Sequence, residues 1–214
     1  MTTADRGDAP GLGALPKHAE ARKALPQPEG WWAEVNSLDL AVYAAIAATP
    51  TPTLDGVFRR LSRAADNSKL WIASAAVLAT VGGPVGRRAA VNGLASVAVT
   101  SAVVNLGLKR LGRRHRPDRA THHVPLTRQV TMPRTTSFPS GHAASASAFA
   151  TGVASAAPEA GIPVSTAATL VAYSRVHTGV HYPVDVIAGS LTGEALALLT
   201  VAALARRRRR RVDA

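Results

Sequence analysis

The sequence predicts an all-α fold, namely a polytopic membrane helix bundle with about six transmembrane helices. Residues 89–108 carry no charged side chain over 20 positions, which is long enough to cross the hydrocarbon core of a bilayer. Residues 184–205 contain only two charged side chains, Asp185 and Glu194. Ala, Gly, Ser and Thr are abundant between these runs, as is typical of helices that pack closely in lipid. We find no alternating pattern that indicates strands.

Four shorter apolar runs complete the predicted bundle. In chain order the six expected spans are residues 36–50, 70–86, 89–108, 141–157, 162–178 and 184–205. The domain embedded in the membrane therefore covers residues 36–205. The first span is short, so it can also lie at the membrane interface without crossing it.

The two ends of the chain differ from this apolar middle. Residues 1–35 are rich in Pro, Ala and charge and have no long apolar core, so we expect a disordered cytoplasmic tail and no secretory signal peptide. Trp31 and Trp32 stand where the chain enters the membrane, a common position for Trp. Residues 206–214 form a basic tail that begins with six consecutive arginines.

Composition narrows the function classes. The chain has no cysteine, which excludes disulfides and thiolate metal sites. It has 25 Lys and Arg against 13 Asp and Glu, a balance that a soluble nucleic-acid binder can show. The apolar runs favour a membrane protein instead, in which a terminal arginine block fixes orientation. We therefore expect no nucleic-acid partner.

The first polar stretch of interest is KRLGRRHRP, residues 109–117. It follows the uncharged run directly. Lys109 and Arg116 are seven residues apart, so on a continuing helix they lie on one face. Taken alone, the stretch is a basic membrane flank.

The second stretch, FPSGHAASASAFATG at residues 138–152, places one titratable side chain among small residues. Two interpretations are open. Ser140 can cap a helix with His142 in its first turn by chance. Alternatively, the helix N-terminus binds an anion and His142 handles a proton.

The third stretch is SRVHTGVHYPVD, residues 174–185. It places Arg175 late in one helix and Asp185 in the first turn of the next, four residues after His181. A carboxylate within reach of an imidazole fixes its tautomer and stabilises its charged form. His177 lies off this pattern, which favours a packing role.

Together and in this order, the three stretches resemble the three-part motif of the type 2 phosphatidic acid phosphatase superfamily. The resemblance covers about residues 50–205. Every motif position is filled: Lys109, Arg116, Pro117, Pro139, Ser140, Gly141, His142, Ser174, Arg175, His181 and Asp185.

The resemblance implies a role for each polar group. Lys109, Arg116 and Arg175 neutralise the phosphoryl oxygens. Backbone N–H groups near Ser140 and Gly141 add donors at a helix N-terminus. The family's chemistry uses no metal and no cofactor.

The resemblance also implies a covalent mechanism. His181 attacks phosphorus and forms a phosphohistidine, while Asp185 holds its ring. His142 protonates the leaving alkoxide and then helps to activate water.

The expected function is therefore that of a membrane lipid phosphate phosphatase. Its partner is a lipid phosphate such as phosphatidic acid or a polyprenyl phosphate or diphosphate, and the sequence does not choose between them. One alternative is a vanadate-dependent haloperoxidase, which shares the motifs. Another is a basic, non-enzymatic membrane protein that binds anionic lipid. Oligomeric state is not readable from the sequence.

The expected location is the cell membrane, with several spans and the active site on the extracytoplasmic face. If the terminal arginines are inside, six spans place all three motif stretches outside. Counting Lys and Arg on each side does not settle the orientation. The density of the C-terminal block and the usual orientation of the family favour this one.

Overall fold

The computed structural model describes residues 30–111 and 114–213, and every regular element in these ranges is a helix. The all-α prediction is therefore confirmed. The elements are α1 (Trp31–Ala48), α2 (Pro52–Ala64), the 3₁₀ turn η1 (Asp66–Ser68), α3 (Lys69–Val81), α4 (Gly83–Ala102), the π-helical segment η2 (Val103–Leu108), α5 (Lys109–Leu111), α6 (Gly141–Ala154), α7 (Pro158–His177) and α8 (Pro183–Val212).

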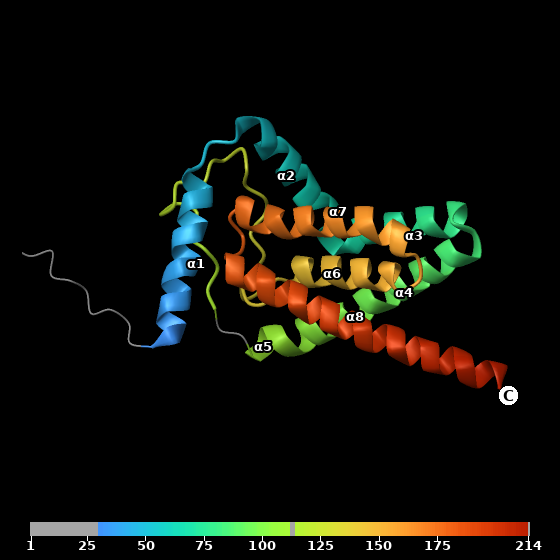
Figure 1. The fold of residues 1–214 in the computed structure, drawn as a ribbon. Helices are drawn as coiled ribbons and strands as arrows, with labels where there is room; N and C mark the ends of the chain where they lie inside the picture. Colours follow the sequence, from blue (N-terminus) through green and yellow to red (C-terminus); the bar gives the residue numbers. More distant parts are fainter. Residues whose placement is uncertain (1–29, 112–113, 214) are drawn as a thin grey trace, which may run out of the picture.

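Helix α6 lies at the centre of the bundle, against α4, α7 and α8 (Figure 1). Most of its buried positions are Ala or Gly, which allows backbones to approach closely. A Cβ atom on Gly193 of α8 would lie 2.0 Å from the carbonyl oxygen of Ala144 in α6. A Cβ atom on Gly152 of α6 would lie 2.7 Å from the carbonyl oxygen of Asn92 in α4. The glycines thus fix α6 between its neighbours and determine where its N-terminus lies.

Within the described part of the chain, two continuous helices are long and apolar enough to cross a membrane, Gly83–Leu111 and Pro183–Val212. Helices α3 and α6 have 13 and 14 residues, or about 20 Å at about 1.5 Å per residue, which is less than a bilayer core. Figure 1 shows α1 crossing the ends of α6, α7 and α8, so it does not run beside them as the expected first span. The count of six spans therefore stays a prediction.

Several predicted boundaries are shifted. The break between the second and third expected spans lies at Gly82 and Gly83, where Gly83 has φ 56°, and not at the arginines that follow. Helix α1 already begins at Trp31, inside the expected tail, while residues 1–29 lie outside the described residues. Helix α8 continues through the arginine block to Val212. Helix α2 was not predicted, because it has too few apolar residues to indicate a transmembrane helix.

A long loop, Arg114–Ser140, covers the end of the bundle where α6 and α8 begin. The side chain of Arg128 anchors this loop to the helices and is only 1% exposed. Its Nε donates to Asp55 Oδ1 of α2 at 2.7 Å, and its Nη1 donates to the Ile46 carbonyl of α1 at 3.0 Å. Since the loop carries part of the first motif, this anchor helps to bring that motif to the other two.

Candidate active site

His181 lies in the turn between α7 and α8 and is 2% exposed. Its Nε2 is 3.1 Å from Nη1 of Arg116, and its Nδ1 is 3.5 Å from Oδ2 of Asp185. Arginine can only donate, so Nε2 is the acceptor and Nδ1 carries the proton. Burial lowers the pKa of His181 to about 3, and the charges of Arg116 and Arg175 act in the same direction. The ring is therefore neutral at pH 7, and its Nε2 lone pair faces the Arg116 guanidinium.

Asp185 is held rigidly behind this ring. Pro183 is the first residue of α8, so Asp185 occupies the third helical position and accepts from the Tyr182 backbone N–H at 3.0 Å. Arg114 donates to its Oδ1 at 2.8 Å, and the Ser137 hydroxyl donates to its Oδ2. Burial opposes ionisation here, and these contacts compensate for it. The position in the first turn of α8 is as predicted.

Arg116 and Lys109 come together without a helix that continues through both residues. Helix α5 ends at Leu111, and Arg116 lies in the loop beyond it. Arg116 donates to the carbonyls of Thr135 at 2.8 Å and Val180 at 2.9 Å. The Lys109 ammonium approaches the Thr135 hydroxyl at 3.4 Å. The two cations therefore meet through the loop segment that precedes the second motif.

Ser140 is the N-cap of α6, as the first interpretation of this stretch predicts, and its hydroxyl accepts from the Ala143 N–H at 3.5 Å. Its own backbone N–H donates to the Asp185 carbonyl at 2.9 Å, which joins the second and third motifs. A Cβ atom on Gly141 would lie 3.3 Å from Lys109 Nζ, so glycine leaves room for the cation at the helix N-terminus.

His142 follows in the first turn of α6. Its Nε2 is 2.8 Å from Oδ1 of Asp66 in η1. This hydrogen bond lowers the pKa of Asp66, which stays ionised and acts as the acceptor. The ring is thus oriented through Nε2, and Nδ1 is its other exchangeable position.

Arg175, near the end of α7, is 2% exposed. Its Nη1 donates to the Ser62 hydroxyl of α2. Its Nε is buried and has no hydrogen-bond partner within the described part of the chain. A buried guanidinium with an unused donor is poorly satisfied by the protein alone, which fits an anionic oxygen as its missing partner.

Sequence reasoning missed several residues that contact the motif side chains. They include Asp66, Arg114, Thr135 and Ser137, and a further carboxylate, Asp39, contacts Arg114. Arg114 lies inside the first motif stretch, and Ser137 immediately precedes the second, so adjacency was a usable signal for both. Asp39 and Asp66 lie far from the motifs in the sequence, and the only signal for them is that carboxylates are rare in this basic, apolar chain.

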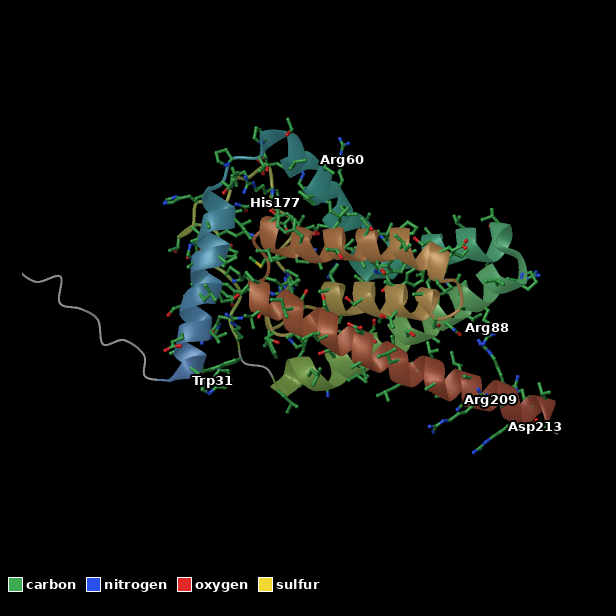
Figure 2. The ribbon with its side chains drawn as sticks, viewed as in Figure 1. Trp31, Arg60, Arg88, His177, Arg209 and Asp213 are labelled. Carbon is green, nitrogen blue, oxygen red and sulfur yellow. The ribbon has the colours of Figure 1, made fainter. Side chains whose placement is uncertain are left out.

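His177 has a different environment from the motif residues, as predicted. Its Nε2 is 2.9 Å from the Thr51 hydroxyl and 3.5 Å from Asp55 Oδ1, and its ring packs on Phe58. Figure 2 shows it at the end of α7 beside α2. It therefore helps to attach α2 to the bundle.

Comparison with known proteins gives this geometry its context. The family model described as the PAP2 superfamily matches residues 89–209. The chain belongs to the PAP2 superfamily. It is 40% identical over 155 residues to the decaprenylphosphoryl-5-phosphoribose phosphatase of Mycolicibacterium smegmatis, covering 70% of this chain and 78% of that protein. It is also 46% identical over 66 residues to an undecaprenyl-diphosphatase of Sulfolobus acidocaldarius, covering 30% of this chain and 32% of that protein.

Two solved structures share the fold. LpxE of Aquifex aeolicus superposes with a TM-score of 0.64 at 23% identity, covering 77% of this chain and 95% of that one. The PAP2-type phosphatidylglycerolphosphate phosphatase of Bacillus subtilis has a TM-score of 0.61 at 24% identity, covering 81% and 87%. The predicted family and enzyme class are thus confirmed: the chain is a membrane protein and a lipid phosphate phosphatase of the PAP2 superfamily.

Proposed function

We propose that this phosphatase works through a phosphohistidine on Nε2 of His181. The observation that carries this proposal is the neutral, buried imidazole, with Nδ1 toward Asp185 and Nε2 beside Arg116. The Nε2 lone pair forms a bond to phosphorus as the bond from phosphorus to the ester oxygen breaks. The electron pair of that bond leaves on the oxygen, which takes a proton from His142.

The second step returns the enzyme to its starting state. Water loses a proton to His142 and attacks the phosphohistidine. The P–N bond then breaks, its electron pair returns to Nε2, and inorganic phosphate leaves. Asp185 stabilises the positive ring while phosphorus is attached. Lys109, Arg116 and Arg175 offset the charge of the phosphoryl oxygens in both steps, together with the N–H groups at the start of α6.

The substrate class that we favour is a phosphate monoester on a polyprenyl-linked lipid. Two of the similar proteins are named for decaprenyl or undecaprenyl substrates. The M. smegmatis relative, which matches 70% of this chain, is named for a prenyl-linked phosphoribose. A phosphate at the end of such a head group would reach the motif side chains while the hydrocarbon chain stays in the bilayer.

Phosphate release from detergent-solubilised protein tests this function. We expect activity to survive excess EDTA, because three cationic side chains perform the charge stabilisation. Vanadate should inhibit, since this oxyanion can become five-coordinate beside His181. Loss of activity on chelation that Mg²⁺ restores would overturn the mechanism.

We further propose that the protein spans the membrane several times, with the active site on the extracytoplasmic face. Figure 2 shows Arg88, Arg209 and Asp213 together at one end of the molecule, far from His177 at the other. The arginine-rich end suits the cytoplasmic side, where Lys and Arg collect.

The absence of cysteine from the chain makes this orientation testable. A cysteine in place of exposed Thr121, in the loop of the active-site end, should react with an impermeant thiol reagent on intact cells. A cysteine in place of Val212 should react only after lysis. The reverse labelling pattern would place the site in the cytoplasm.

A further inference from the structure

A polar pocket of about 180 Å³ opens next to His142. It lies between η1, the α4–η2–α5 helix and α6. Its lining includes Lys109, Gly141 and His142, but neither His181 nor Arg116 nor Arg175. The pocket therefore adjoins the candidate phosphate site on the side of the general acid, where the leaving group of the ester must lie.

Neutral hydrogen-bonding groups dominate the rest of this lining. They are the side chains of Asn67, Ser68, Ser101, Asn105 and Ser145. Ser101 and Ser145 are 3.3 Å apart across α4 and α6. Asn105 Oδ1 lies 3.8 Å from the position of a Cβ on Gly141, and the Asn105 side chain is exposed, with no hydrogen bond to another side chain within residues 30–111 and 114–213. The Ser101 and Ser145 hydroxyls thus pair with each other, while the Asn105 amide is open to a ligand in the pocket.

Asn105 is a polar residue in an otherwise apolar part of a candidate membrane helix. It interrupts the apolar segment Val103–Leu108, and polar side chains inside membrane helices mark functional positions. This segment is π-helical, a rare geometry that recurs at functional sites. Asn67 and Ser68, on the opposite rim, both have positive φ, 54° and 59°. Backbone conformations of this kind cluster at functional sites.

We infer that this pocket binds the hydroxyl groups of a sugar or other polyol unit that lies between the scissile phosphate and the lipid chain. Lys109 is the one Lys or Arg residue among those lining the pocket, so a second phosphate attached directly to the scissile one, as in a diphosphate, would be poorly neutralised. A bare prenyl chain would remove water from the Asn105 amide without replacing its hydrogen bonds. Leu106, 64% exposed and next to Asn105, offers apolar surface by which the chain reaches lipid.

This inference rests on the proposed phosphatase function, and a substrate panel separates the two. We would measure kcat/KM of detergent-purified protein with a polyprenylphosphoryl pentose 5-phosphate, a polyprenyl phosphate, a polyprenyl diphosphate and p-nitrophenyl phosphate. The pentose 5-phosphate should be the best lipid substrate. No activity on any of the four would overturn the phosphatase function itself.

Variants then test the pocket. Asn105→Leu and the double variant Ser101→Ala/Ser145→Ala should each lower kcat/KM for the pentose 5-phosphate by about tenfold, the effect of one lost hydrogen bond. Their turnover of polyprenyl phosphate and p-nitrophenyl phosphate should be unchanged, which also shows that they fold. Asn105→Gln keeps the amide and should retain most of the activity. Ser147→Ala, on the same helix but outside the pocket, is the matched control.

Two results would overturn the inference. An equal loss on all substrates would mean that the pocket serves the phosphate itself. Unchanged turnover of the pentose 5-phosphate in both pocket variants would mean that its hydroxyls bind elsewhere.

Discussion

We expect replacement of His181 with alanine to abolish phosphate release from a lipid phosphate and from an aryl phosphate alike. The nucleophile is needed whatever oxygen leaves, because the bond to phosphorus forms at Nε2 in both cases. The neighbouring cations still bind phosphate, so substrate affinity falls less than turnover. Removing a covalent nucleophile costs on the order of 10⁴-fold or more in kcat, and we expect a loss of this size.

The measurement is turnover of both substrates together with acid-labile phosphate labelling of the protein. His123→Asn is a suitable control, since it removes an exposed imidazole from the loop and keeps a residue that tolerates the φ of 50° found there. Phosphoenzyme labelling that persists in His181→Ala would show that another residue is the nucleophile.

The groups that sequence could place are those fixed by short-range geometry. Asp185 follows His181 by four residues, and the proline that opens α8 puts the carboxylate in the first turn beside the imidazole. Ser140 caps α6 because a small hydroxyl residue stands immediately before a run of helix formers. Each of these relations spans fewer than five residues, so local rules determine it.

Contacts between distant segments could not be found this way. Asp66 meets His142 across 76 residues, and Asp39 of α1 reaches Arg114 across 75. Both carboxylates lie in segments whose position depends on how the whole bundle packs, and neither belongs to a motif. The helix that carries Lys109 does not continue to Arg116, so helical periodicity does not describe how the two cations meet. Instead, Arg116 is held by Thr135, which lies 19 residues further along the chain.

The misplaced helix ends have a packing cause as well. Arg87 and Arg88 mark a membrane boundary in the charge pattern, but the chain turns earlier, at Gly82 and Gly83. A Cβ on Gly86 would lie 2.1 Å from the Leu78 carbonyl oxygen, so α3 and α4 touch backbone to backbone at this corner. Charge patterns report where a segment meets water, whereas glycines report where two helices can touch.

His142→Ala should separate the two substrates that His181→Ala affects equally. A lipid alkoxide is strongly basic and needs a proton as it leaves, whereas a nitrophenolate leaves readily without one. General acid catalysis is commonly worth about a hundred- to ten-thousandfold, so turnover of the lipid phosphate should fall by that much. With the aryl ester the variant should still form phosphoenzyme, visible as an initial burst of nitrophenolate, because only the second step lacks its base.

Asp66 offers an independent check on this role. Since Asp66 accepts from Nε2 of His142, it orients the ring and stabilises its protonated form, with Lys109 and Arg175 nearby as opposing charges. Asp66→Asn should therefore act as a weaker His142→Ala, lowering lipid turnover, moving the basic limb of its pH profile to lower pH and sparing the aryl burst. Asp118→Asn, which removes an exposed carboxylate from the loop, should change none of these. If His142→Ala loses phosphoenzyme formation from both substrates equally, His142 binds phosphate instead of donating a proton, and the Asp66 pair then serves to position that contact.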